Sequence, residues 1–203
     1  MTENPRAAFF DGIADQWDGW QDSAALMGKL ENGLEELGVG ADETVLDVGC
    51  GTGNLTRALL RKLSTIGRVV AIDVSPRMIE VARKKVSDPR VAWHTADARR
   101  LPLPDQSCDR VICCSVWPHF DHHAEVAAEL SRVLRPEGSL HVWHLGSRAR
   151  INAIHASAGE AIRRDVLPSA GETARLLARI GLKVSLAVED EERYLVTAVK
   201  SAP

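Results

Sequence analysis

Residues 45–56 read VLDVGCGTGNLT, and this stretch decides how the chain folds. A short apolar run ends in three closely spaced glycines, and Leu55, Leu59 and Leu63 then recur at the spacing of one helix face. This order predicts a strand, a tight turn and a helix. Glycine has no side chain, so a ligand can approach the backbone closely at such a turn, and the first amides of the following helix lack intrahelical partners. The stretch therefore predicts a nucleotide-binding loop.

The glycine loop is compatible with two classes of nucleotide ligand. A dinucleotide fingerprint needs a third glycine at the position that Asn54 occupies, which argues against a nicotinamide-dependent oxidoreductase. The spelling DVGCGTG, with Asp47 ahead of the turn, resembles motif I of the class I S-adenosylmethionine (SAM) methyltransferases, in particular the small-molecule enzymes of the quinone-biosynthesis group. The resemblance implies an enzyme that binds SAM and transfers its methyl group.

Apolar runs and helical patterns alternate along the rest of the chain, which predicts a doubly wound parallel sheet with helices on both faces. The next expected strands lie at 69–72, 91–95, 109–114 and 139–144. The last two strand-like runs, 182–189 and 193–200, are joined by only three residues, so they predict an antiparallel hairpin. The resemblance therefore implies an α/β, Rossmann-like, doubly wound seven-stranded sheet, mostly parallel with the last strand antiparallel.

We expect residues 1–203 to form a single methyltransferase domain. Its expected parts are N-terminal lid helices (1–40), a SAM-binding core (41–145), a helical insertion that shapes the acceptor pocket (146–181) and a C-terminal β-hairpin (182–203). In the first part Phe9, Phe10, Ile13 and Trp17 recur at helical spacing. That pattern is typical of a lid over the ligands and equally of an amphipathic helix packed on the sheet edge.

Several local signals predict element ends and orientations. Ser75 and Pro76 form a helix cap and a first helical residue after the second strand. Gly138 is expected to take the turn before the fifth strand, where the family usually carries two glycines and this chain has Glu137 first. In the insertion, Ile154 is expected to face inward.

The resemblance also assigns the cofactor site. It places the following residues around SAM: Asp47, Gly49, Cys50, Gly51, Gly53, Asn54, Asp73, Val74, Met78, Ala96, Asp97, Ala98 and Cys114. Asp73 ends the second strand, where an acidic side chain can accept hydrogen bonds from ribose hydroxyls. Asp97 is the adenine-binding acid that the resemblance implies after the third strand.

Histidines at the ends of strands four and five suggest the chemistry of the acceptor site. His119 and His144 are candidate catalytic residues, either of which can act as a general base for the acceptor. Together with His155 they are also candidate ligands of a divalent metal that lowers the acceptor's pKa. A third hypothesis is that they only line the pocket. The second function that remains open is a SAM- or metal-binding protein that transfers no methyl group.

The composition bounds the partners. The net charge of −3 lacks the excess of basic residues that is typical of nucleic-acid-binding proteins. No apolar run is long enough for a membrane span. The polar N-terminus does not read as a secretory signal, and the four cysteines have no metal-type spacing and are expected to be reduced. We therefore expect a cytoplasmic protein whose partner is a small-molecule acceptor.

Overall fold

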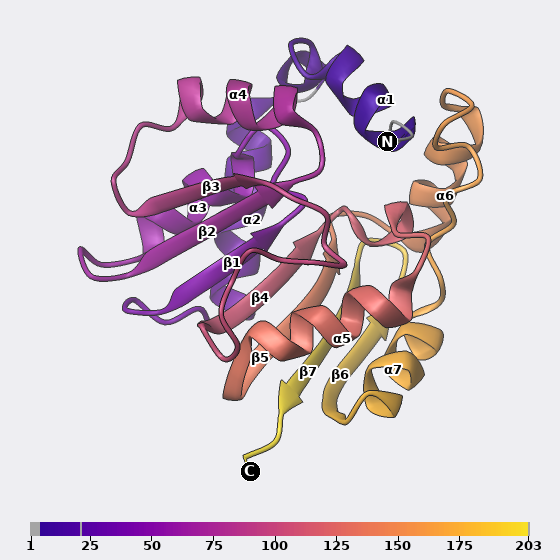
Figure 1. The fold of residues 1–203 in the computed structure, drawn as a ribbon. Helices are drawn as coiled ribbons and strands as arrows, with labels where there is room; N and C mark the ends of the chain where they lie inside the picture. Colours follow the sequence, from indigo (N-terminus) through magenta and orange to yellow (C-terminus); the bar gives the residue numbers. More distant parts are fainter. Residues whose placement is uncertain (1–4, 21, 203) are drawn as a thin grey trace.

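The computed structural model describes residues 5–20 and 22–202, whose strands form one sheet in the order β3-β2-β1-β4-β5-β7-β6 (Figure 1). The strands are β1 (Thr44–Val48), β2 (Arg68–Asp73), β3 (Val91–Thr95), β4 (Cys108–Cys114), β5 (Leu134–His144), β6 (Leu182–Glu189) and β7 (Tyr194–Lys200). Neighbouring strands are parallel except at β7, which is antiparallel to both β5 and β6. The predicted fold class and the predicted hairpin are confirmed.

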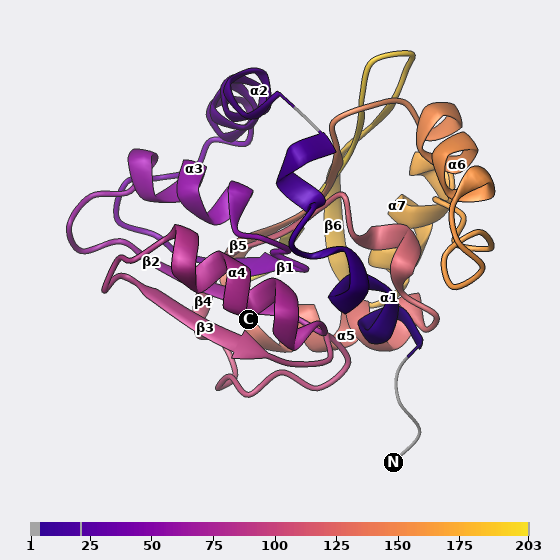
Figure 2. The ribbon, with the colours of Figure 1, turned by 90° about the horizontal axis from the view of Figure 1, so that it is seen from above.

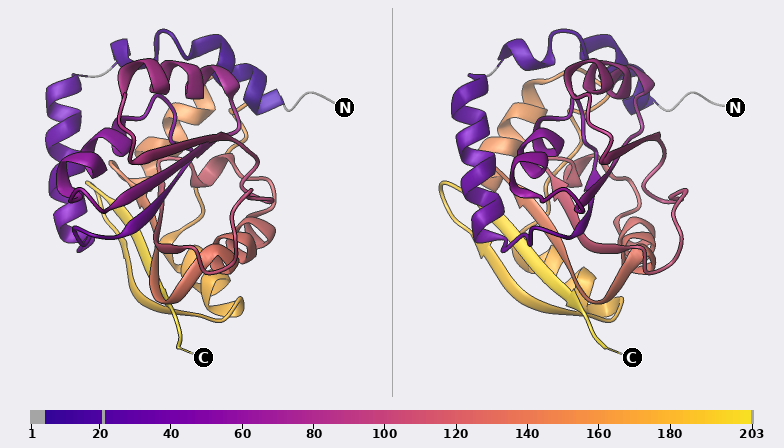
Figure 3. Two further views of the ribbon diagram at one scale, coloured as in Figure 1. Left: turned by 60° about the vertical axis from the view of Figure 1, so that its left-hand side comes forward. Right: turned by 90° about the vertical axis from the view of Figure 1, so that its left-hand side faces the viewer.

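Helices pack on both faces of the sheet, as the alternating pattern predicts. The helices of the described residues are α1 (Pro5–Ile13), the short 3-10 helix η1 (Trp17–Trp20), α2 (Ser23–Glu36), α3 (Asn54–Lys62), α4 (Pro76–Lys85), the 3-10 helix η2 (Trp117–His119), α5 (His123–Val133), α6 (Arg148–Ser157) and α7 (Ala170–Arg179). One apolar core joins the sheet to α2, α3 and α4, and a second joins it to α5 and α7. Figure 2 shows α2 and α3 together on one side, and Figure 3 shows α2 alongside α3.

Short-range signals set several helix ends. The Ser75 hydroxyl accepts a hydrogen bond from the Met78 amide and so caps α4, with Pro76 as its first residue. Ser169 and Glu172 form the reciprocal capping box that begins α7. Gly38 follows α2 in a left-handed conformation, with φ of 65°. The predicted cap at Ser75 and Pro76 is confirmed, and all three of these helix ends depend on neighbours in sequence.

Three local expectations are wrong. Glu137, with φ of 65°, takes the left-handed position before the main part of β5, and Gly138 does not. A Cβ on Gly138 would lie 2.7 Å from the Asp109 carbonyl oxygen of the adjacent strand, so this glycine is needed for close packing of backbones. The strand also begins at Leu134, earlier than expected. Ile154 is 52% exposed, because α6 turns that side toward the mouth of a cavity.

All four cysteines are free thiols. Across the described ranges, none of the helices is both long and apolar enough to cross a membrane.

Candidate active site

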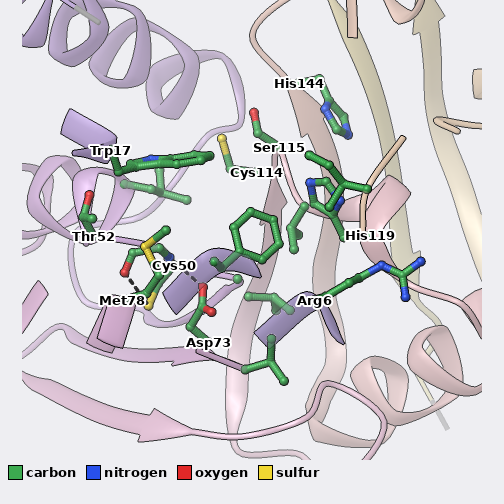
Figure 4. Close-up of a pocket in the computed structure, with 18 of the residues that line it drawn as sticks. Arg6, Trp17, Cys50, Thr52, Asp73, Met78, Cys114, Ser115, His119 and His144 are labelled. Carbon is green, nitrogen blue, oxygen red and sulfur yellow. Dashed lines mark hydrogen bonds between the residues drawn. The ribbon is translucent and has the colours of Figure 1, made fainter. Parts of the chain in front are cut away.

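A cavity of about 900 Å³ lies at the carboxyl ends of β1, β2, β4 and β5, where open α/β sheets bind their ligands (Figure 4). The N-terminal segment and α6 form its outer wall. Its volume is near the upper end of the roughly 300–1,000 Å³ that small-molecule sites span. One continuous space therefore has room for a nucleotide-sized ligand and a second molecule beside it.

The glycine loop after β1 shapes the floor of this cavity. A Cβ on Gly49 would collide with the Val116 side chain, whereas a Cβ on Gly51 would meet nothing within 4 Å. Both glycines have positive φ, of 66° and 52°. Gly51 therefore leaves its backbone open to a ligand. Gly53 caps α3 and instead packs toward Trp93, which would be 3.1 Å from an added Cβ.

Two buried carboxyl groups flank the loop. Asp73 accepts the Gly51 amide on one oxygen and the Ser75 amide on the other, each at 2.9 Å. Burial raises the pKa of Asp73, and these amide hydrogen bonds oppose the rise. Asp47 accepts the Thr56 hydroxyl at 2.6 Å, and burial raises its pKa to about 7. Both carboxyls are thus oriented before any ligand binds.

The structure brings the expected cofactor residues together, with one exception. Those that line the cavity are Asp47, Gly49, Cys50, Gly51, Asn54, Asp73, Val74, Met78, Ala96, Asp97, Ala98 and Cys114. Gly53 does not line it, for the packing reason given above. Asp97 is half-exposed and pairs with Arg99 at 2.6 Å. Burial raises the pKa of the Cys114 thiol to about 12, so this sulfur is a thiol and not a nucleophilic thiolate.

The N-terminal segment is docked over the cofactor side by acidic side chains. Asp11 accepts hydrogen bonds from the Ser75 hydroxyl at 2.5 Å and from the Arg77 amide at 3.0 Å. Asp15 forms an ion pair with Arg77 at 2.7 Å. These contacts hold α1 against the start of α4, beside the loop that carries Asp73.

Asp18 extends the same docking to the glycine loop. It accepts hydrogen bonds from Thr52 at 2.7 Å and Asn54 at 2.9 Å, and it pairs with Lys85 at 2.7 Å. Sequence reasoning missed these contacts. The recurrence of acids at 11, 15 and 18, three to four residues apart, is the signal that could have indicated one acidic face.

His119 lies across the cavity from the glycine loop and is held by Asp165. Its Nδ1 lies 2.7 Å from Asp165 Oδ2. Because a carboxylate only accepts, Nδ1 carries the proton in the neutral ring and Nε2 has the free lone pair. The ring of Phe10 stacks edge-on at 5.1 Å. Burial lowers the pKa of His119, and the Asp165 hydrogen bond opposes this.

Asp165 is itself paired with the N-terminal segment. Arg6 donates to both of its oxygens, at 3.0 and 2.6 Å, and also pairs with Asp121 at 2.5 Å. Burial alone would raise the pKa of Asp165, but the hydrogen bonds from His119 and Arg6 outweigh it and lower the pKa to about 2. Asp165 is therefore ionised. Neither Arg6 nor Asp165 lies in a pattern that sequence reasoning could single out.

The other two candidate histidines lie close by. The His155 ring is 4.8 Å from that of His119, and its Nδ1 donates to the Asp165 carbonyl oxygen at 2.7 Å. His144 is fully buried and packs edge-on against Tyr194 at 5.5 Å. Among the described residues, no group of three or more His, Cys, Asp or Glu is arranged to hold a metal ion. The divalent-metal hypothesis is therefore not supported.

Comparison with known proteins agrees with this geometry. The family model for a methyltransferase domain matches residues 46–142. Methyltransferase GfsG of Streptomyces halstedii is 34% identical over 160 residues, which cover 73% of this chain and 56% of the relative. The ubiquinone/menaquinone biosynthesis C-methyltransferase UbiE of Hahella chejuensis is 29% identical over 210 residues, which cover 99% of this chain and 78% of the relative. These matches support a class I SAM-dependent methyltransferase.

The solved methyltransferase structures share the fold over most of their length. A SAM-dependent methyltransferase from Aquifex aeolicus has a TM-score of 0.77 at 24% identity and covers 93% of this chain and 97% of its own. The [4+2]-cyclase SpnF has a TM-score of 0.65 at 18% identity, and the match covers 81% of this chain and 77% of the cyclase. Because a cyclase shares it, the fold alone does not set the reaction. This chain spans 56% of the length of GfsG and 63% of the length of the UbiE of Stutzerimonas stutzeri.

Proposed function

We propose that this protein transfers the methyl group of SAM to a small-molecule acceptor, with His119 as the general base. The observation that carries the proposal is the single cavity that joins the glycine loop to the His119–Asp165 pair. One end has the features of a nucleotide site, and the other has a largely buried histidine whose ring packs against that of Phe10. The two ends are thus suited to two molecules that react with each other.

At the cofactor end, the residues of this chain bind and orient. Gly51 gives backbone access, Asp73 offers carboxylate oxygens to ribose hydroxyls, and Asp97 is suited to the adenine side. SAM, when bound, supplies a methyl group on a positively charged sulfur, which is a strong electrophile. The protein's own part is to align the acceptor with that methyl carbon and to exclude water.

At the acceptor end, His119 removes the acceptor's proton. Asp165 holds the ring with Nδ1 protonated, so Nε2 is the basic atom. Because burial lowers the pKa of His119, the ring is neutral and ready to accept a proton near pH 7. The ionised Asp165 then stabilises the imidazolium that forms, as an orienting carboxylate does in other acid–base pairs.

A small molecule is the acceptor class that the cavity favours. The N-terminal segment packs over one side of the cavity through Arg6, Asp11 and Asp18, and the cavity volume of about 900 Å³ is in the range of small-molecule sites. Relatives named for ubiquinone and menaquinone biosynthesis also support a small-molecule acceptor. The proposed enzyme is cytoplasmic.

The test begins with calorimetric titration of SAM and S-adenosylhomocysteine into the purified protein. Mass spectrometry then measures S-adenosylhomocysteine release with a panel of phenols, quinols and amines. We expect micromolar binding and release with at least one acceptor class. The variant His119→Gln should bind SAM normally and lose release, whereas His94→Gln, on β3 and outside the cavity, should retain both.

Two outcomes would contradict the proposal. Absence of SAM binding would remove the cofactor assignment. Tight SAM binding without release for any member of the panel would favour the alternative, a SAM-binding protein that transfers no methyl group.

A further inference from the structure

His144 is a buried imidazole without a polar partner in the protein. It is 0% exposed, and neither ring nitrogen has a hydrogen-bond partner among the residues that the structure describes. A buried polar group left without a hydrogen bond costs roughly 1–3 kcal/mol of folding free energy. A side chain that is so costly to the fold, and that lines the cavity, points to a ligand that satisfies it.

The surroundings explain why the protein itself does not satisfy this ring. His144 ends β5 and lies opposite Tyr194 of β7, whose ring packs edge-on against it. The Tyr194 hydroxyl is already bonded to Thr173 at 2.7 Å. Figure 4 shows the His144 ring on the same side of the cavity as His119. The free nitrogens therefore belong to the acceptor end of the cavity.

A second buried histidine on the same strand provides a contrast. His141 is 2% exposed, and its nitrogens lie 3.0 Å from the Thr197 hydroxyl and 2.6 Å from an Arg110 nitrogen. Its position is away from the cavity, and it is fully bonded. Within the described ranges, the other buried side-chain polar atom without a partner is Trp117 Nε1, which does not line the cavity.

We infer that His144 recognises a neutral hydroxyl or carbonyl group of the acceptor, beside the atom that His119 deprotonates, and so selects which acceptors bind. This inference rests on the proposed methyltransferase function. A neutral imidazole has one donor and one acceptor, which match a hydroxyl in either direction and a carbonyl through the N–H. A carboxylate at this depth would need a cation. Arg6 is already shared by Asp165 and Asp121, and Arg150, which also lines the cavity, is at an exposed position.

The electrostatics of the site agree with this role. Burial, and the nearness of His119 and His155, lower the pKa of His144 to about 3. The ring is therefore neutral at physiological pH and remains neutral while His119 gains and loses a proton. His119 and His144 thus have separate tasks: the first moves a proton and the second binds a group that does not react.

The first experiment compares thermal unfolding of the protein without ligands in three variants. His144→Phe replaces an unsatisfied ring by an apolar ring of similar shape, so we expect an unchanged or higher Tm. His141→Phe breaks two hydrogen bonds on the same strand, so we expect a lower Tm. His144→Gln keeps a neutral donor and acceptor and serves as the conservative variant. A fall in Tm for His144→Phe as large as that for His141→Phe would overturn the inference, because His144 would then be a structural residue.

The second experiment uses phenol and benzoate as probes, in the presence of S-adenosylhomocysteine, with nitrogen NMR of labelled histidine side chains. We expect phenol to shift the His144 resonances and to bind His144→Phe about fivefold more weakly, the effect of one neutral hydrogen bond. His144→Gln should bind phenol within about twofold of the original protein, and benzoate should leave His144 unshifted. Equal phenol binding by the original protein and His144→Phe, or a benzoate shift at His144, would overturn the inference.

S-adenosylhomocysteine separates this inference from the proposed function. If the original protein fails to bind it, the methyltransferase proposal itself fails. Suppose that the original protein and all variants bind S-adenosylhomocysteine equally, and that substitutions at position 144 do not change phenol binding. The proposed function then stands and the role of His144 is refuted.

Discussion

The variant Asp165→Asn tests how the protein positions its base. The substitution keeps the shape of the side chain and removes the charge that accepts the His119 hydrogen bond at 2.7 Å. A hydrogen bond to a charged partner contributes about 1.5–3 kcal/mol. If that contribution serves the transition state, the loss corresponds to a decrease of about ten- to a hundredfold in kcat.

The pH dependence distinguishes positioning from a structural role. Asp165 raises the pKa of His119 against the lowering effect of burial. Without the carboxylate the pKa of His119 falls further, so the acid limb of the rate profile should move to lower pH while the plateau drops. The assay is S-adenosylhomocysteine formation measured by mass spectrometry between pH 5 and pH 9. The affinity for SAM should be unchanged, since Asp165 lies at the acceptor end.

A matched control uses the other carboxylate on Arg6. Asp121→Asn removes an exposed partner of Arg6 and leaves the His119–Asp165 pair intact, so its kcat should change less than threefold. Because Arg6 retains Asp121 in the Asp165→Asn variant, we expect a loss of stability below the roughly 3–5 kcal/mol of a fully broken buried pair. An unchanged kcat and an unmoved acid limb in a folded Asp165→Asn protein would refute the reasoning.

Three further substitutions test the cofactor side. Asp73→Ala removes the carboxylate offered to the ribose and should raise the Kd for SAM about a hundredfold in calorimetry; a change below threefold would contradict the assignment. The Asp47 carboxyl has a pKa of about 7 in the folded state, above its value in the unfolded state. Its contribution to the stability of the folded state is therefore fully present below about pH 4 and is lost as the pH rises through 7. Asp47→Asn should therefore gain Tm relative to the original protein between pH 5 and pH 8, and parallel Tm curves would exclude this. Asp18→Ala breaks the contacts with Thr52 and Lys85, so limited proteolysis should cut residues 5–20 faster; equal rates would show that the other aspartates hold the segment.

Features that depend on sequence neighbours could be predicted. The glycine loop, the cap at Ser75 and the acid at the end of β2 each lie beside a strong periodic pattern, which also sets the order of strands and helices. The short link before β7 leaves the hairpin as the one arrangement that the chain can reach. The resemblance then adds roles for residues whose positions the pattern already indicates.

Features that depend on distant neighbours could not be predicted. Arg6 and Asp165 are separated by 159 positions in the chain, and neither lies in a repeating pattern. The role of Gly138 depends on the Asp109 carbonyl of another strand, which no local spacing reveals. Similarly, His119 and His144 have equivalent positions in the sequence pattern, since each follows or ends a strand. Only the structure shows that His119 is held by a carboxylate and that the His144 ring has no hydrogen-bond partner.

The placement of β7 between β5 and β6 has a consequence for how the molecule assembles. β6 leaves the ribosome before β7, yet its place in the sheet exists only after β7 has paired with β5. Until then the outer edge of β5 presents unpaired amides and carbonyls, a template for pairing with another chain. Pairing that waits for distant segments is also slow. Nascent chains that have emerged only as far as Arg193 therefore leave the β5 edge open to pairing with another chain, and insertion of residues 194–200 covers it.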